Sequence, residues 1–255
     1  MGRMLVRETL SQAEATLAGG SARPGSDIVG QDLGHLAGLK AAGLVATDDA
    51  DALFAASDAV IDFTRTELLA HHADLAMRHS TALIVGTTGF DDAARAVIDQ
   101  AAAKIAVVQA ANMSVGVTLL GQLVRQVAAK LDAGIFDIEI VEMHHRHKID
   151  APSGTALALA QAAAAGREVR LDDVARKTRD GHIGPRPQGE IGISTLRGGD
   201  VVGDHTVIFA SEGERIELTH KASSRQIFAR GAVRAALWAA GRKPGLYSML
   251  DVLGL

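Results

Sequence analysis

The chain has 255 residues, of which 47% are hydrophobic, with a formal net charge of −4 and no cysteine. This composition supports a buried core in one large or two modest domains, and it excludes a disordered chain and a basic nucleic-acid binder. Without cysteine, disulfides and thiolate chemistry are also excluded, which fits a cytoplasmic protein. No apolar run approaches the roughly 20 residues of a membrane span, so we expect neither a membrane nor a nucleic-acid partner.

The first part of the chain alternates predicted helices with short apolar runs. A helix is predicted at 3–12 and a short strand at 15–20. Further helices are predicted at 48–56, 65–79 and 91–103, and further strands at 59–63, 82–86 and 105–108. This alternation is typical of a parallel sheet flanked by helices. Ligands bind at the carboxyl ends of such strands, so we expect a cofactor cleft formed by residues 63–65, 86–88 and 110–113.

The pattern changes after residue 114. Helices are predicted at 115–132, 155–165 and 226–240, and strands at 135–143, 190–197, 202–210 and 214–221. The spacing of the last three strands indicates antiparallel meanders. We therefore expect a mixed, largely antiparallel sheet with helices on one face. Its second face must also be covered, and pairing with another subunit is one solution.

Residues 142–156 concentrate the polar chemistry of the chain. After a predicted strand come His144, His145, His147 and Lys148, followed by a turn and a predicted helix N-terminus at Pro152, Ser153 and Gly154. Ser153 can cap the helix, and Gly154 lets a ligand approach the backbone. The free N–H groups of the first turn attract anions. With the charge of Lys148, these features predict a carboxylate or phosphate site with imidazoles placed for proton transfer.

Two other interpretations of this stretch stay open. Three histidines can ligate a metal. A straight strand, however, places His145 and His147 on one face and His144 on the other, and no acidic partner stands at a zinc-like spacing. We therefore predict no metal. The second alternative is a solvated polar loop, against which the density of Pro, Gly, Lys and His residues argues.

The runs at 144–148 and 150–156 resemble the signature of the 4-hydroxy-tetrahydrodipicolinate reductase family, also called dihydrodipicolinate reductase. The resemblance extends over nearly the whole chain, through 61–65, 86–90, 110–116 and 220–225. It implies an α/β protein with a Rossmann-like parallel nucleotide-binding domain and an α+β substrate-binding and oligomerisation domain with a mixed sheet. We place the first domain at 1–114 and 225–255 and the second at 115–224. The resemblance also implies a homotetramer.

The resemblance further implies an oxidoreductase of lysine and diaminopimelate biosynthesis. Its members reduce 4-hydroxy-tetrahydrodipicolinate to tetrahydrodipicolinate with NADPH or NADH. On this sequence His144 corresponds to the acid/base and Lys148 to a second proton donor. The small cyclic dicarboxylate would be bound by His145, Gly154, Thr155 and Arg225, although Arg225 also fits a structural pair near a domain junction. The expected cofactor-binding residues are Gly2, Gly86, Thr87, Thr88, Ala110, Ala111, Asn112 and Met113. His147 receives no role.

The N-terminal part departs from the family pattern in two ways. A nucleotide-binding domain normally begins with a strand and a glycine-rich turn, and Gly2 resembles only the last glycine of that turn. We therefore expect the native protein to start upstream of Met1, with an apolar strand and two more glycines. NAD-selective sites also place an acid after the second strand, where this chain has Arg23 and no acid until Asp27. Arg23 fits a cofactor 2′-phosphate, which favours NADPH or dual use, or is a solvated loop residue.

Two rival functions stay open. Another Rossmann-type imine or amino-acid dehydrogenase would lack the motif at 144–156. A catalytically impaired, truncated homologue would act only as a binding or scaffold protein. The scaffold interpretation requires that no NADPH binds, so nucleotide titration separates it from the enzyme.

Overall fold

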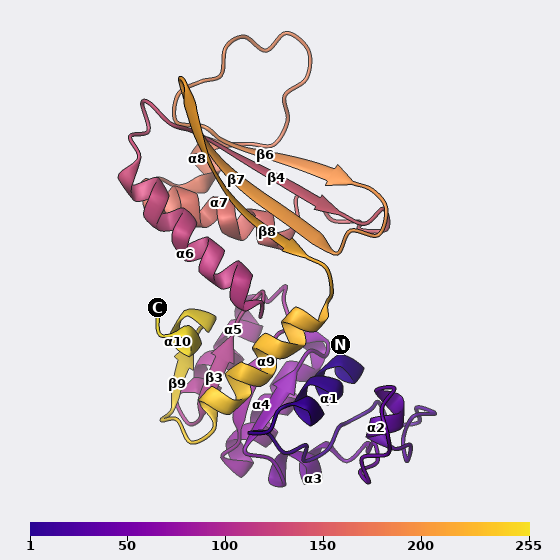
Figure 1. The fold of residues 1–255 in the computed structure, drawn as a ribbon. Coiled ribbons are helices and arrows are strands. Elements are labelled where there is room, and N and C mark those ends of the chain that lie inside the picture. Colours follow the sequence, from indigo (N-terminus) through magenta and orange to yellow (C-terminus); the bar gives the residue numbers. More distant parts are fainter. The chain divides into compact units, whose positions relative to one another are not determined.

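The computed structural model describes residues 1–255. The chain forms two compact units (Figure 1). One unit joins Met1–Val115 to Gln226–Leu255, and the other is Gly116–Arg225. Below, these are called the discontinuous unit and the central unit. No helix is both long and apolar enough to cross a membrane.

The discontinuous unit is built on a parallel four-stranded sheet. Its strands are, in sheet order, β1 (Ala59–Asp62), β2 (Ala82–Val85), β3 (Ala106–Gln109) and β9 (Gly245–Tyr247). One face is covered by α3 (Ala50–Ala55), α4 (Leu69–His79) and α5 (Asp92–Ala102), and the other by α1 (Gly2–Ser11), α9 (Gln226–Ala239) and α10 (Met249–Leu253). Leu83 and Val85 face the first helix layer and Ile84 faces the second, as the alternation of a strand requires. Two short elements, α2 (Leu33–Leu36) and the 3₁₀ turn η1 (Thr66–Leu68), complete the unit.

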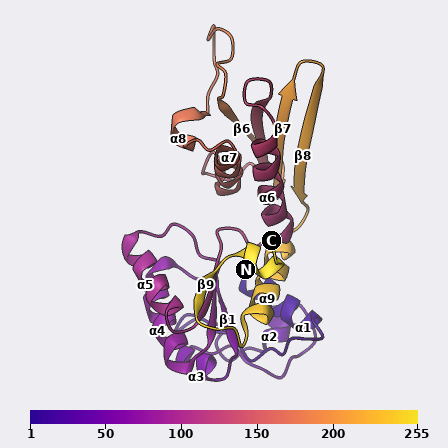
Figure 2. The same ribbon diagram turned by 90° about the vertical axis from the view of Figure 1, so that its left-hand side faces the viewer.

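The central unit contains a mixed five-stranded sheet. Its strands are, in sheet order, β5 (Ala175–Arg176), β6 (Ile191–Arg197), β4 (Asp137–His144), β7 (Gly203–Ser211) and β8 (Glu214–Ala222). The helices α6 (Val115–Lys130) and α7 (Gly154–Gly166) cover one face (Figures 1 and 2), and the short α8 (Leu171–Val174) follows α7. Ile138, Ile140, Leu159 and Phe209 fill the core between helices and sheet. The site described below lies at the end of β4.

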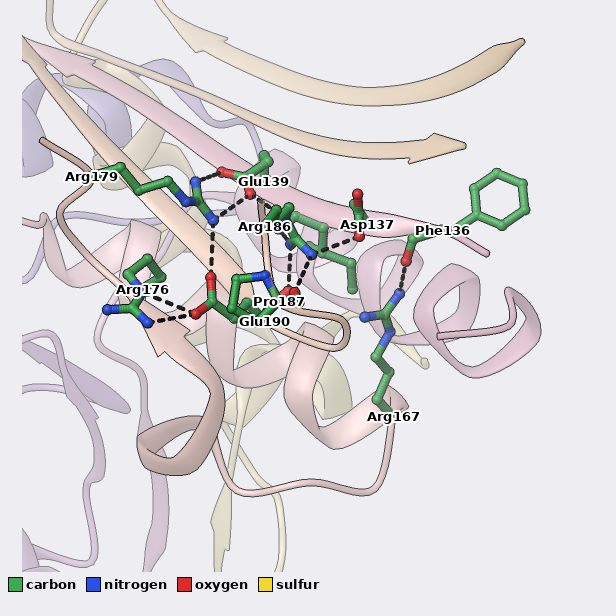
Figure 3. Close-up of polar contacts among 10 residues, drawn as sticks. Phe136, Asp137, Glu139, Arg167, Arg176, Arg179, Arg186, Pro187 and Glu190 are labelled. Atoms are coloured by element: carbon green, nitrogen blue, oxygen red, sulfur yellow. Dashed lines mark hydrogen bonds and ion pairs between the residues drawn. The ribbon is translucent and has the colours of Figure 1, made fainter. Parts of the chain in front are cut away.

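Arginines fasten the loop between β5 and β6 to the opposite face of this sheet (Figure 3). Arg186 donates from Nε to Glu139 Oε1 at 3.0 Å and from Nη1 to Asp137 Oδ1 at 2.6 Å. Arg179 donates to both oxygens of Glu139, at 2.8 and 2.9 Å. Glu139 and Asp137 stand at the alternate positions of β4 from the buried isoleucines. From Asp137 to Ile140, the strand therefore carries paired carboxylates on one face and apolar core residues on the other.

The long predicted elements are confirmed, but two predictions are wrong. Residues 15–20 form no strand, and next to them Ser21 makes only an isolated bridge with Thr47. The strand at 190–197 exists as β6 but is not part of a meander, because it pairs in parallel with β4. That register places Ile191 beside Ile138 and buries both. Spacing along the chain could not show that β4 inserts between β6 and β7.

We predict opposite effects for two Gly→Ala substitutions in helices. In α9, a Cβ at Gly231 would collide with the Met113 carbonyl oxygen, whereas a Cβ at Gly121 in α6 meets no atom within 4 Å. Gly231→Ala should destabilise the protein by about 1–3 kcal/mol through overpacking. Gly121→Ala should stabilise it by roughly 0.5–1 kcal/mol, because alanine has the higher helix propensity. Urea unfolding of both variants measures this, and unchanged or raised stability of Gly231→Ala would contradict the packing of α9.

Candidate active site

The last residues of β4 form a buried acid–imidazole pair. Burial alternates along this strand, so Glu142 and His144, two residues apart, both point to the helix-covered face. The Glu142 side chain is fully buried and that of His144 nearly so. His144 Nδ1 lies 2.6 Å from Glu142 Oε2. An ionised carboxylate only accepts hydrogen bonds, so Nδ1 is the donor and Nε2 is left for other partners.

Further donors from two other elements surround the Glu142 carboxylate. Arg197 at the end of β6 donates to both oxygens, at 2.8 and 3.0 Å, and the Ser153 N–H donates to Oε1 at 3.0 Å. Burial by itself raises the pKa of the Glu142 carboxyl. The hydrogen bonds from Arg197, His144 and Ser153 outweigh burial and hold this pKa below its ordinary value. Glu142 is therefore a stable anion beneath His144.

A second buried histidine packs against the first. His205 on β7 meets His144 edge to face, with ring centroids 5.1 Å apart. Burial, and next the neighbouring His144, lower the pKa of His205 to about 4. The ring is therefore neutral near pH 7. Its Nε2 lies 3.1 Å from Ser153 Oγ, and this hydroxyl also accepts the Ala156 N–H as the N-cap of α7.

The turn after β4 carries the more exposed groups. Because β4 ends at His144, the strand-face argument does not apply to His145 and His147, whose rings lie 6.3 Å apart in the turn. His145 Nε2 lies 3.3 Å from a guanidinium nitrogen of Arg225, and partial burial together with this charge lowers the His145 pKa. Lys148 donates to both Asp150 oxygens, at 2.8 and 2.9 Å. No cluster of three or more His, Cys, Asp or Glu side chains is arranged to hold a metal.

The predicted substrate residues thus come together within the central unit. His144 ends β4, and His145 contacts Arg225. Gly154 and Thr155 open α7, where Gly154 is exposed and an added Cβ would meet nothing within 4 Å. The backbone there is open to a ligand, next to the turn that carries Lys148.

In the discontinuous unit, the loops after β1 and β2 line an open hollow of about 460 Å³, formed by residues 63–67 and 86–88. Thr87 Oγ1 donates to the Thr64 carbonyl at 3.0 Å, and a Cβ at Gly86 would collide with the Phe63 ring. Beneath it, buried Asp62 binds His72 Nδ1 at 2.7 Å and the Thr64 N–H at 2.7 Å. Burial alone would raise the Asp62 pKa, but these bonds hold it below its ordinary value.

The other predicted cofactor residues occupy separate positions of the same unit. The segment at 110–113 follows β3, next to β2, with Met113 buried and Ala111 exposed. Asn112 Oδ1 accepts the Ser114 N–H at 2.8 Å. Gly2 opens α1, and Arg23 lies exposed in the loop before α2. Neither Gly2 nor Arg23 lines the hollow.

Several residues of these sites were missed in the sequence. Glu142 could have been found from the sequence, because a charged residue at an inward-facing position of an alternating strand needs buried partners. No sequence pattern points to Arg197, His205 or His72, since each meets its partner only through sheet register or helix packing.

Comparisons with known proteins cover the whole chain. Residues 1–113 match the family described as dihydrodipicolinate reductase, N-terminus, and residues 116–253 match its C-terminus. The 4-hydroxy-tetrahydrodipicolinate reductases of Allorhizobium ampelinum and Beijerinckia indica are each 53% identical over 255 residues, which is all of this chain and 94% of theirs. A solved structure of dipicolinate-bound dihydrodipicolinate reductase from Paenisporosarcina sp. TG-14 has a TM-score of 0.74 at 24% identity, covering 98% of this chain and 94% of that one.

These matches leave no support for the rival interpretation as another imine or amino-acid dehydrogenase. The relatives carry the name of one reductase, both family descriptions agree with it, and the solved structure shares the fold. The chain belongs to the dihydrodipicolinate reductase family.

Proposed function

We propose that the central unit binds 4-hydroxy-tetrahydrodipicolinate, with His144 as its proton donor, and that the discontinuous unit binds the NADPH or NADH that this reductase family uses. The observation that carries the proposal is the His144 imidazole, which is held by a buried anion next to the open N-terminus of α7. A proton donor and an anion-binding backbone are the two features that reduction of an unsaturated dicarboxylate requires.

The loops of the discontinuous unit fit a dinucleotide. They follow two neighbouring parallel strands, and Gly86 keeps the backbone clear where a side chain would meet Phe63. Such a position at the carboxyl end of a parallel sheet is where dinucleotides bind in this fold class. The bound nicotinamide cofactor supplies the hydride. The exposed guanidinium of Arg23 supports NADPH as the preferred cofactor or dual use, because it fits a 2′-phosphate.

His144 supplies the proton from Nε2, since Nδ1 is engaged by Glu142. Neutral His205 beside it adds no second positive charge, so it does not oppose the imidazolium. Lys148 is paired with Asp150 and exchanges this partner for a substrate carboxylate when it acts as the second donor. His145, Arg225 and the first N–H groups of α7 hold the carboxylates.

The ligand of the solved relative supports this substrate class. The reductase from Paenisporosarcina was solved with dipicolinate, which is a cyclic dicarboxylate. The central unit offers groups suited to such a dianion, namely Lys148, the Arg225–His145 contact and the N-terminal end of α7.

We also propose a homotetramer located in the cytoplasm. The sheet face opposite α6 and α7 presents Leu196, which is 48% exposed, beside its partly exposed β4 partner Met143. Exposed apolar side chains on the part of this face that no helix covers support association with other subunits.

Three substitutions test the assignment of roles. His144→Ala should lower kcat by about 10²–10⁴-fold with KM little changed, because it removes a proton donor. Lys148→Ala should lower kcat and raise KM, since it removes a charge as well as a donor. Thr155→Val should mainly raise KM, because it keeps the shape and removes a hydroxyl at the anion site. Steady-state kinetics measure these effects, and circular dichroism checks folding.

The control for this series is His182→Ala, which removes an exposed loop histidine and should keep wild-type kinetics. Near-wild-type kcat in folded His144→Ala would overturn the assignment and make His145 or His147 the candidate acid.

The cofactor preference is tested at Arg23. Wild-type enzyme should use NADPH at least as efficiently as NADH, and Arg23→Ala should lower kcat/KM for NADPH selectively, because only NADPH carries the 2′-phosphate. Steady-state kinetics with both cofactors measure this ratio. Unchanged values for both would show that Arg23 is a solvated loop residue.

His205 should make stability depend on pH. Its pKa is about 4 in the folded chain against an ordinary 6.5, so between these values the unfolded chain binds the proton more strongly and stability falls as the pH is lowered. From about pH 7 to about pH 5 this loss is on the order of 2 kcal/mol. His205→Gln should reduce the pH dependence of urea unfolding by that amount. His182→Gln should not, and equal pH dependence in all three proteins would contradict a neutral, buried His205.

A further inference from the structure

We propose that Glu142, clamped by Arg197, is the positioning residue that fixes the tautomer of His144, so that Nδ1 always carries a hydrogen and the reaction proton is exchanged only at Nε2. The inference rests on the proposed role of His144 and assigns its supporting groups. Neither Glu142 nor Arg197 needs to contact the substrate for this role.

The hydrogen bonds of the Glu142 carboxylate allow neutral His144 only the tautomer with its hydrogen on Nδ1. Oε1 accepts from Ser153 N–H and Arg197 Nη2, and Oε2 accepts from Arg197 Nη1 and His144 Nδ1. A carboxylate has no hydrogen to offer, so an Nδ1 without a hydrogen would set two lone pairs against each other at 2.6 Å. Which imidazole nitrogen is protonated is set by the bond that the other nitrogen makes.

Arg197 keeps this carboxylate ionised and in place. The parallel register of β4 and β6 puts Arg197 beside His144, and the guanidinium grips both Glu142 oxygens at 2.8 and 3.0 Å. The same guanidinium donates at 2.7 Å to the carbonyl oxygens of Asp150 and Leu196. A planar fork with this many directed donors is specific to arginine, so lysine cannot reproduce the clamp. The clamp also ties the Glu142–His144 pair to the turn that carries Lys148.

The surroundings of the ring hold its free edge in a defined direction. A Cβ built at Gly203 would lie 3.0 Å from His144 Nε2 and 3.4 Å from Cδ2, so a side chain at this position would crowd that edge of the ring. The edge-to-face contact with His205 supports the ring from a different element. The ring is therefore fixed through Nδ1, while no side chain at position 203 stands against Nε2.

The strand itself offers a matched control for Glu142. Glu139, on the opposite face of β4, is likewise clamped by arginines, namely Arg179 and Arg186 (Figure 3), and touches no imidazole. Glu139→Gln thus removes an arginine-paired carboxylate from the same strand without changing the support of His144. A general loss of ion pairing in β4 would affect both variants, whereas loss of tautomer control would affect only Glu142→Gln.

The experiment is nitrogen NMR of the full chain labelled with ¹⁵N-histidine, combined with steady-state kinetics. His144→Ala identifies the His144 signals by their loss. At a pH where His144 is neutral, the wild type and Glu139→Gln should show His144 with hydrogen on Nδ1. In Glu142→Gln the amide can donate to Nδ1, so the hydrogen should move to Nε2 in a measurable fraction of molecules. The kcat of this variant should fall by about 10²-fold, within the range of a general acid–base contribution.

Arg197→Lys keeps the positive charge and serves as a second variant if Glu142→Gln does not fold. Because lysine does not hold the Glu142 carboxylate against Nδ1 in one orientation, this variant should show mixed His144 tautomers and about a 10-fold lower kcat. Wild-type tautomer and kcat in a folded Glu142→Gln, or in Arg197→Lys, would overturn the positioning role. Failure of the proposed function looks different, since His144→Ala would then keep its kcat while the tautomer shift in Glu142→Gln still appeared.

Discussion

The central unit depends on keeping one fully buried carboxylate charged. Glu142 has no exposed surface, and a buried charge without partners costs several kcal/mol or neutralises itself. Its donors come from β6, from the start of α7 and from β4 itself. The carboxylate therefore ties together the end of a strand, a parallel neighbour and the N-terminus of a helix. These are the elements that border the proposed substrate site.

Each unit contains a buried carboxylate that binds a histidine. Asp62 at the end of β1 and Glu142 near the end of β4 are both buried carboxylates that bind a histidine Nδ1, at 2.7 and 2.6 Å. Asp62 also holds the Thr64 N–H, so its pair shapes the loop that lines the hollow. Glu142 instead engages only Nδ1 of His144, whose Nε2 is the proposed site of proton exchange. Similar pairings thus hold a loop in one unit and the proposed proton donor in the other.

His144, at the end of β4, and its neighbour His205, on β7, differ in their hydrogen-bond partners because their surroundings differ. His205 has no buried anion of its own as a partner, and burial lowers its pKa to about 4. His144 lies directly on the Glu142 carboxylate. A neutral ring thus stands next to an anion-paired ring: His205 packs and supports the cap of α7, while His144 is the proposed proton donor.

The sequence by itself determined the long elements and the motif. Alternation of apolar residues located β2 and β4, and the Pro-Ser-Gly turn located the N-terminus of α7, because these signals are local. The proposed catalytic His144 and Lys148 were found because they lie within that same short stretch. Only the tertiary structure decided what supports them. β6 joins β4 in parallel, and so Arg197 reaches Glu142 across 55 positions of the chain, while His205 reaches Ser153 across 52. No local pattern encodes such contacts, since they follow from strand order and packing, which the whole chain determines at once.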